Sequence, residues 1–321
     1  MVRPGLCRLA QLLAGPRAEP VRVPLFSPRL GLRRWLSVQV PPGYRPGRAY
    51  PIAYLFRGHY TEWLNPAQDA SRAEILPARV LRAIETGELP PLVLVFPCLG
   101  SDDRRFHTVA ADWGAAHQAR SASGMGLGRF ESHLVHEVLP RVESALQLEE
   151  PCRLAIGFSL GGLVALQLAL RHPRLFSHVG AYDPSFFRDP PDAEDTILHH
   201  TMFDPVFGRP RDSTRVKTHS PIWLCRQLPQ EQLQRMKFYL QSGPEAAEPN
   251  DSNYERTARF LRELQARGLS NQLPQVVEEG HHDWETADRF VLRVLRAALG
   301  RTLDPEGTRD SQQEQEGAKT D

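Results

Sequence analysis

Near the middle of the chain, residues 157–161 place a serine between two glycines in the order Gly-Phe-Ser-Leu-Gly. Residues 153–156 before it are short and apolar enough for a buried strand, and residues 162–170 after it form an apolar run suited to a helix. A sharp turn between a strand and a helix leaves no room for a side chain at the two positions that flank its apex. Glycine, which has no side chain, fits at both positions. The segment therefore predicts a strand, a sharp turn with Ser159 at its apex, and a helix.

The pattern G-x-S-x-G in this context is a nucleophile elbow, which exposes a serine hydroxyl at the end of a strand. The alternative is a glycine-rich turn without chemistry. A free serine is a poor nucleophile and needs a base within hydrogen-bond reach. If Ser159 is a nucleophile, the rest of the chain must supply that base.

Strand and helix patterns alternate from residue 51 onward, which is typical of an α/β fold with a parallel sheet. The predicted strands of this part are residues 51–56, 91–96, 153–156, 177–182, 236–240 and 275–277, and the predicted helices are 71–87, 130–146, 252–268 and 284–299. Residues 21–26 and 34–40 alternate apolar and polar side chains, as antiparallel edge strands do. We therefore expect a single doubly wound sheet, mostly parallel, with antiparallel N-terminal strands.

We expect one domain over residues 19–300, flanked by a frayed N-terminus at 1–18, which we do not read as a targeting segment, and a disordered polar tail at 301–321. Residues 183–234 are proline-rich and irregular, and form a candidate cap over the carboxyl ends of the strands. The aromatic residues of this segment either line a pocket or form a satellite core, and the sequence leaves both open. They are Phe186, Phe187, Phe203, Phe207 and Trp223.

The composition of the 321-residue chain limits the kinds of partner that we expect it to bind. A net charge of +1 gives no reason to expect nucleic acid or a membrane surface, and no apolar run approaches the roughly 20 residues that span a bilayer. The four cysteines are widely spaced without a C-x-x-C pair, which favours reduced thiols in a cytoplasmic protein over a zinc site or disulfides. We expect a small-molecule partner and no metal or cofactor. The oligomeric state stays open.

Candidates for the base and the acid follow from the order of a hydrolase triad, which is serine, then acid, then histidine. The base should lie in a loop after the last strand, where His281 and His282 stand. The acid should follow the penultimate strand, where the loop offers three carboxylates. Glu245 is the first choice because it is closest to the strand end, and Asp251 is the alternative. Glu248, and Asp183 at the end of the preceding strand, are further options.

Two backbone N–H groups are needed to stabilise the oxyanion of a tetrahedral intermediate. One should be that of Leu160, the residue after the nucleophile, at the positive end of the elbow helix. The second should come from the loop after strand 51–56. There Gly58 lets the backbone approach the substrate, and the N–H of His59 is the candidate donor.

Four stretches together resemble a known family. They are the elbow at 157–162, Arg-Gly-His at 57–59, the helical segment 130–140, and Gly-His-His-Asp-Trp at 280–284. They are similar to the esterase D-like branch of the α/β-hydrolases, which includes enterochelin-esterase-type enzymes, S-formylglutathione hydrolases, feruloyl esterases and mycolyltransferases. The likeness covers about residues 20 to 300 of this chain.

The resemblance implies an α/β-hydrolase fold and a serine carboxylic-ester hydrolase that works through an acyl-enzyme. It selects His282 over His281 as the base, with Trp284 packed behind it, and implies an acid in the loop that carries Glu245. An acyltransferase would share these residues and use an alcohol in place of water. A peptidase, and a non-catalytic binding protein of the same fold, are the remaining alternatives.

Overall fold

One seven-stranded sheet organises the molecule, in the order β1-β2-β4-β3-β5-β6-β7. The computed structural model describes residues 19–119, 123–187, 195 and 199–300. The strands are β1 (Val21–Ser27), β2 (Leu32–Gln39), β3 (Ile52–Phe56), β4 (Val93–Pro97), β5 (Arg153–Phe158), β6 (His178–Tyr182) and β7 (Lys237–Gln241). The expected N-terminal and C-terminal tails, 1–18 and 301–321, lie outside the described residues.

The strand directions confirm the predicted architecture. The strands β1 and β2 pair antiparallel, and β2 joins β4 antiparallel. The five strands from β4 to β7 are parallel to one another. The parallel strands β3 and β4 are buried at every position, as strands covered on both faces should be.

The strand predicted at residues 275–277 is wrong. In the described part of the chain this segment makes only an isolated parallel bridge, between Ser242 and Val276. The side chain of Asn271 takes the place of a neighbouring strand at Leu240. Its Oδ1 accepts from the Leu240 N–H at 2.8 Å, and its Nδ2 donates to the Leu240 carbonyl at 2.8 Å. Because one side chain satisfies these groups, β7 needs no further strand there.

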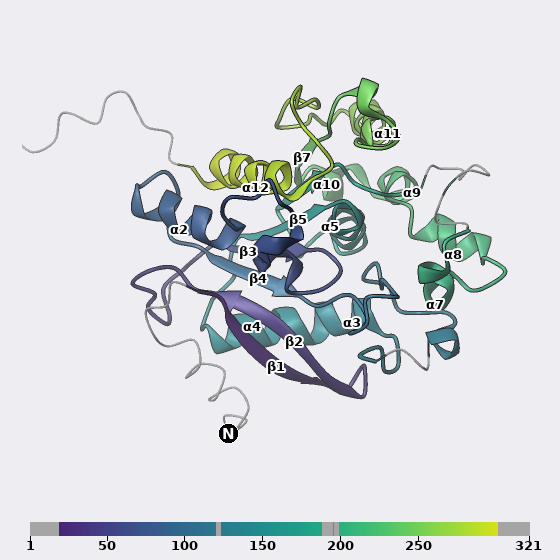
Figure 1. Cartoon of the computed structure of the whole chain (residues 1–321), viewed down its shortest axis with the longest axis horizontal. Coiled ribbons are helices and arrows are strands. Elements are labelled where there is room, and N and C mark those ends of the chain that lie inside the picture. The colour runs from purple at the N-terminus through teal and green to yellow at the C-terminus, as the bar shows by residue number, and fades with distance from the viewer. Residues whose placement is uncertain (1–18, 120–122, 188–194, 196–198, 301–321) are drawn as a thin grey trace, which may run out of the picture.

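Helices cover both faces of the sheet (Figure 1). One face carries α2 (Leu76–Glu85) and α12 (Trp284–Leu299), whose apolar side chains share a core with the sheet. The other face carries α4 (Leu139–Ala145), α5 (Leu160–Arg171) and α11 (Tyr254–Ala266). The C-terminal helix matches the prediction, while α2 is shorter than the predicted 71–87 and begins next to Pro77, a residue suited to a first helical turn.

The predicted helix 130–146 is divided in three. It consists of α3 (Phe130–His133), a π-helical turn (Leu134–Val138) and α4. Pro140 lacks the N–H that would donate to the carbonyl four residues earlier, so regular α-helical bonding is interrupted at this point.

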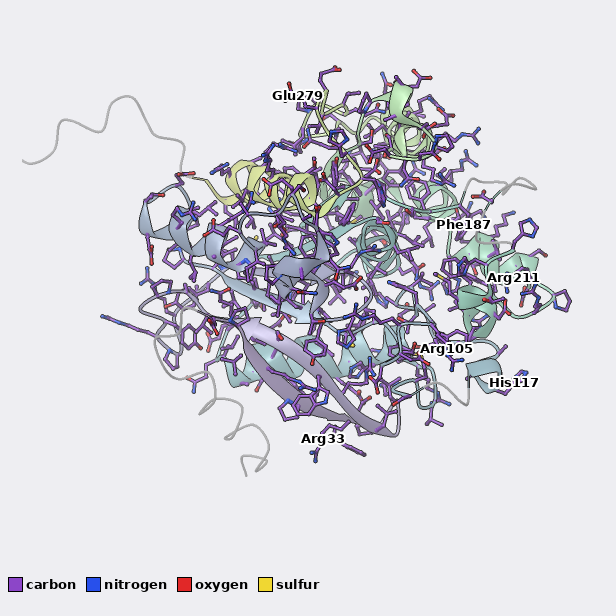
Figure 2. The ribbon with its side chains drawn as sticks, in the orientation of Figure 1. Arg33, Arg105, His117, Phe187, Arg211 and Glu279 are labelled. Carbon is purple, nitrogen blue, oxygen red and sulfur yellow. The ribbon has the colours of Figure 1, made fainter. Side chains whose placement is uncertain are left out.

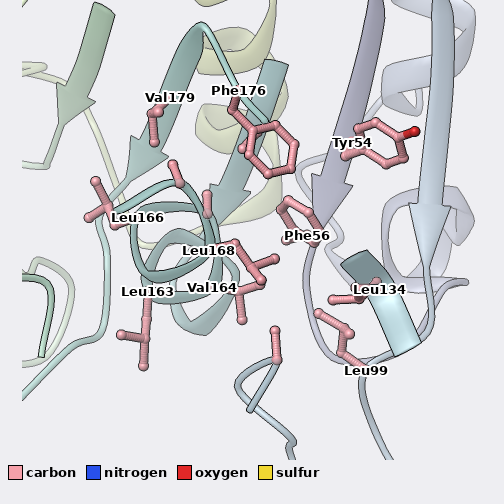
Figure 3. Close-up of a cluster of buried hydrophobic side chains, with 14 of the residues drawn as sticks. Tyr54, Phe56, Leu99, Leu134, Leu163, Val164, Leu166, Leu168, Phe176 and Val179 are labelled. Carbon is pink, nitrogen blue, oxygen red and sulfur yellow. The ribbon is translucent and has the colours of Figure 1, made fainter. Parts of the chain in front are cut away.

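The elbow helix α5 is apolar on nearly every side because it lies inside the molecule, and its one buried polar side chain, Gln167, donates to the Val109 carbonyl at 3.1 Å. Every residue from 161 to 170 is buried, as expected of a helix without a polar face. Figure 3 shows Val164 and Leu168 of this helix close to Phe56 of β3, with Leu163 and Leu166 on its other sides. The start of the helix, and Ser159 before it, are therefore held by core packing.

The candidate cap, residues 183–234, contains short helices, whereas the sequence suggested an irregular segment. In the described part of 183–234 these are α7 (Asp204–Phe207), α8 (Ser213–Thr218), α9 (Pro221–Gln227) and α10 (Gln230–Leu233). Its four phenylalanines are buried in the main core, which favours the core reading over a pocket lining. Figure 2 shows Phe187 beside these helices, and its ring lies 6.0 Å from that of Phe207. That the segment caps a site stays a prediction.

Candidate active site

The serine turn has the strained geometry that the two glycines permit. Ser159 has φ 56° and ψ −122°, a conformation that residues other than glycine rarely adopt. A Cβ on Gly157 would lie 2.0 Å from the Gly161 carbonyl oxygen, and one on Gly161 would lie 1.9 Å from that of Phe56. Only glycine fits at either position, so the turn between β5 and α5 is closed around Ser159.

The structure brings His282 to this serine. Its Nε2 lies 3.1 Å from the Ser159 Oγ. The imidazole lies against Phe158, with ring centres 4.8 Å apart, and Trp284 packs edge-on against the same phenylalanine at 5.3 Å. His282 lies on the loop before α12, and Figure 2 shows Glu279 of this loop at the molecular surface. The aromatic contacts hold the ring in the plane in which Nε2 faces the serine.

The carboxylate that contacts the other ring nitrogen is Asp183. Its Oδ2 is hydrogen-bonded to the Nδ1 of His282, and the side chain is fully buried. The sheet register explains this position. Phe158 of β5 pairs with Tyr182 of β6, so the next residue of each strand, Ser159 and Asp183, emerges at the same edge of the sheet.

The first choice for the acid, Glu245, is therefore corrected to Asp183 at this contact. Glu245 is exposed on a single turn of 3-10 helix (Glu245–Ala247) after β7. The Oε1 of Glu248 accepts the backbone N–H of Glu255 at 2.8 Å. The loop turns outward at these residues, and neither carboxylate is the partner of the His282 ring.

Asp251, the alternative acid, holds the histidine loop by its backbone. Its Oδ1 accepts the N–H of His282 at 2.8 Å, and its Oδ2 lies 2.5 Å from the Nδ1 of His281. This hydrogen bond and the attraction of the carboxylate raise the pKa of His281. Burial raises the pKa of Asp251, but its hydrogen bonds to His281 and His282 outweigh that effect and lower it. Asp251 thus positions the loop that carries His282.

The two candidate oxyanion donors differ in their surroundings. Leu160 is the first residue of α5, where helical N–H groups have no partner within the helix. The N–H of His59 donates to the Oε2 of Glu62, so a carboxylate occupies this donor. The His59 ring bonds instead to the Thr61 Oγ1 at 2.7 Å. Burial and then the charge of Arg104 lower the pKa of His59 to about 4.

A buried ion pair ties the loop after β3 to the helix after His282. Arg72 bonds both oxygens of Asp288 in α12, at 2.7 and 2.9 Å, and both side chains are fully buried. The same guanidinium donates to the Trp63 carbonyl at 2.9 Å and to the Glu62 carbonyl at 3.2 Å. The loop of His59 and the helix that follows His282 are therefore fixed to one another.

Sequence reasoning missed two residues beside Ser159, His282 and Asp183. The Oγ of Ser185 lies 3.1 Å from the Ser159 Oγ. Asn253 donates its backbone N–H to the Asp183 Oδ1 at 2.7 Å and its side-chain Nδ2 to the Ser185 Oγ at 3.2 Å. The position of Ser185, two residues after an aspartate at a strand end, was a usable signal for one of them. Nothing in the sequence distinguishes Asn253 from a helix-capping residue.

Within the described ranges, no three histidine, cysteine or acidic side chains gather in a way that could hold a metal ion. Among the helices of the same ranges, none is long and apolar enough to cross a membrane.

The parallel sheet, with its serine elbow after β5 and its histidine before the last helix, defines an α/β-hydrolase fold. Solved structures of this class are similar along nearly the whole chain. A ferulic acid esterase has a TM-score of 0.63 and 18% identity, over 87% of this chain and 96% of its own. An S-formylglutathione hydrolase from Agrobacterium tumefaciens has a TM-score of 0.63 and 14% identity, over 89% and 98%.

The model of the family described as "Putative esterase" matches residues 27–298, and the chain belongs to this esterase family. A curated relative, Esterase Rv1288 of Mycobacterium tuberculosis, is 28% identical over 156 residues. The match covers 48% of this chain and 29% of that relative, so the chain spans less than a third of the relative's length.

Proposed function

We propose that the protein is a serine carboxylic-ester hydrolase in which Ser159, His282 and Asp183 form the catalytic triad. The observation that carries the proposal is the chain of contacts from the Ser159 Oγ to the His282 Nε2, and from the His282 Nδ1 to the buried Asp183. A base oriented by a carboxylate on its far nitrogen is what activates a serine hydroxyl.

In the proposed reaction, the Ser159 Oγ attacks the ester carbonyl carbon as its proton passes to the His282 Nε2. The carbonyl electron pair moves to the oxygen, and the tetrahedral intermediate collapses when His282 protonates the leaving alcohol. Water, deprotonated by His282, then attacks the acyl-enzyme and releases the acid and the free serine. Asp183 keeps the proton of His282 on Nδ1, so that Nε2 can accept one.

The proposed oxyanion donors are the N–H groups of Leu160 and His59. Leu160 lies at the positive end of α5, where the helix dipole favours a negative charge. For His59 to act, the carboxylate of Glu62 must leave its N–H when substrate arrives.

Replacing Glu62 with alanine is expected to raise kcat/KM for a simple ester by about tenfold, since one oxyanion donor is worth at least that factor. The reason is that the N–H of His59 no longer starts the reaction bonded to a carboxylate. The measurement is steady-state hydrolysis of a p-nitrophenyl ester. Thr61→Ala is the control, because Thr61 contacts the ring of His59. An unchanged or lower kcat/KM for Glu62→Ala would place the second donor elsewhere.

The partner that we propose is a small-molecule ester, and the location is the cytoplasm. Three cysteines in the described ranges, Cys98, Cys152 and Cys225, are free thiols, which supports a reducing compartment.

A fluorophosphonate probe tests the function directly, because it phosphonylates only a serine with an active base. Labelling is expected on the peptide that contains Ser159, and is expected to be lost in Ser159→Ala and in His282→Ala. The same variants are assayed for p-nitrophenyl ester hydrolysis. No labelling of the wild-type protein, or labelling of another serine, would rule out the proposed mechanism.

A further inference from the structure

We propose that Ser185 is a second catalytic hydroxyl, which donates a hydrogen bond to the Oγ of Ser159 while that atom is negatively charged. The inference rests on the proposed function and adds a residue to it. The two hydroxyl oxygens lie 3.1 Å apart. The N–H of Ser185 also donates to the Ser159 carbonyl at 3.1 Å, so main chain and side chain both hold Ser185 against the nucleophile.

The direction of this hydrogen bond follows from Asn253. The Nδ2 of Asn253 donates to the Ser185 Oγ at 3.2 Å. Its amide orientation is set by Arg256, whose Nη1 donates to the Asn253 Oδ1 at 2.9 Å, and an arginine can only donate. This orientation makes the group that faces Ser185 the Nδ2, which can only donate and which also donates to the Asp183 carbonyl at 3.1 Å and to the Asp183 Oδ2 at 3.3 Å. The Oγ of Ser185 therefore accepts from Nδ2 and keeps its own proton for another partner.

The partner that remains for this proton is the Oγ of Ser159. The proton of Ser159 itself points to the Nε2 of His282, because the Nδ1 of the imidazole carries its proton toward Asp183. All protons therefore run in one direction, from Asn253 through Ser185 and Ser159 to His282. Asp183 also accepts the backbone N–H of Asn253 at 2.7 Å, so one residue orders both the acid and the second hydroxyl.

The contribution of Ser185 changes during the reaction because the charge on the Ser159 Oγ changes. As the proton of Ser159 moves to His282, Oγ becomes anionic and accepts the Ser185 hydrogen bond more strongly. When the bond between Oγ and the acyl carbon forms, that charge disappears. In deacylation the same bond breaks, and Ser185 stabilises the departing Oγ until His282 returns the proton. Ser185 keeps its own proton throughout.

The experiment compares the rate of fluorophosphonate labelling and kcat/KM for a p-nitrophenyl ester in the wild-type protein and Ser185→Ala. We expect both to fall by about 10- to 100-fold, the factor that a hydrogen bond to a charged group supplies. Ser185→Cys keeps the shape of the side chain but replaces the hydroxyl with a larger and weaker donor, and it is expected to show the same loss. Ser242→Ala is the matched control, because the Ser242 hydroxyl is buried without a partner in the described residues and is expected to be neutral.

Melting temperatures establish that each variant is folded. Normal labelling of Ser159 in the wild-type protein with an unchanged rate in Ser185→Ala or Ser185→Cys would overturn the role of Ser185 and leave the proposed function standing. A wild-type protein that is not labelled would overturn both.

Discussion

Replacing Asp183 with asparagine is expected to lower kcat for ester hydrolysis by about 10⁴-fold, as loss of the carboxylate does in a triad. The substitution leaves the side-chain volume nearly unchanged. It removes the charge that holds the proton on the Nδ1 of His282 and stabilises the imidazolium. The measurement is steady-state hydrolysis of a p-nitrophenyl ester, with the melting temperature followed in parallel to show that the variant is folded.

The matched control is Glu245→Gln, which makes the same chemical change at the carboxylate that the sequence favoured. It is expected to keep full activity, because Glu245 is exposed on the turn after β7. The opposite pattern, with activity lost in Glu245→Gln and kept in Asp183→Asn, would return the acid to the loop after β7.

Replacing Asp288 with alanine is expected to lower the free energy of unfolding by about 3–5 kcal/mol, the cost of breaking a buried ion pair. The guanidinium of Arg72 would remain inside the molecule without a counter-charge. Its remaining hydrogen-bond partners would be the carbonyls of Glu62, Trp63 and Asn65, none of which carries a charge. Urea denaturation followed by tryptophan fluorescence measures the change.

Glu88→Ala provides the comparison, because it removes another ion pair made to the same helix. Glu88 bonds Arg296 of α12, but about half of each side chain is exposed to solvent. Exposed pairs of this kind often contribute nothing measurable, so the free energy of unfolding is expected to stay the same. An Asp288→Ala variant as stable as Glu88→Ala would mean that the pair with Arg72 does not hold the two segments together.

Local sequence patterns were sufficient to predict most of the architecture. The apolar parallel strands, the elbow and the C-terminal helix each carry a pattern that depends only on neighbouring residues. The missing last strand shows the limit, because one asparagine side chain, Asn271, pairs with the backbone of Leu240 in place of a strand. The division of helix 130–146 is a second difference, because Pro140 interrupts a segment whose apolar pattern continues across it.

Part of the site was also predictable, because some of its residues stand in local sequence patterns. Ser159 and His282 stand in short motifs at fixed places in the chain order. The acid has no motif, and several carboxylates follow strand ends. Choosing Asp183 over Glu245 requires knowing that β6 lies beside β5, and that Phe158 pairs with Tyr182. The bond between Glu62 and the His59 N–H depends on the conformation of a loop, which spacing along the chain does not determine.

The adjacency of β5 and β6 also determines how two members of the proposed triad are placed. Ser159 and Asp183 follow paired residues on neighbouring strands, so their separation is set by the main-chain ladder, whose strands lie about 4.8 Å apart in any sheet. Side-chain substitutions around them cannot easily alter that distance. His282 instead lies on a loop, which is held by Asp251 and by the Tyr182 hydroxyl, which donates to the His281 carbonyl at 2.7 Å. Natural variation that tunes this enzyme without dismantling it should therefore concentrate around the histidine loop, and spare the β5–β6 pair.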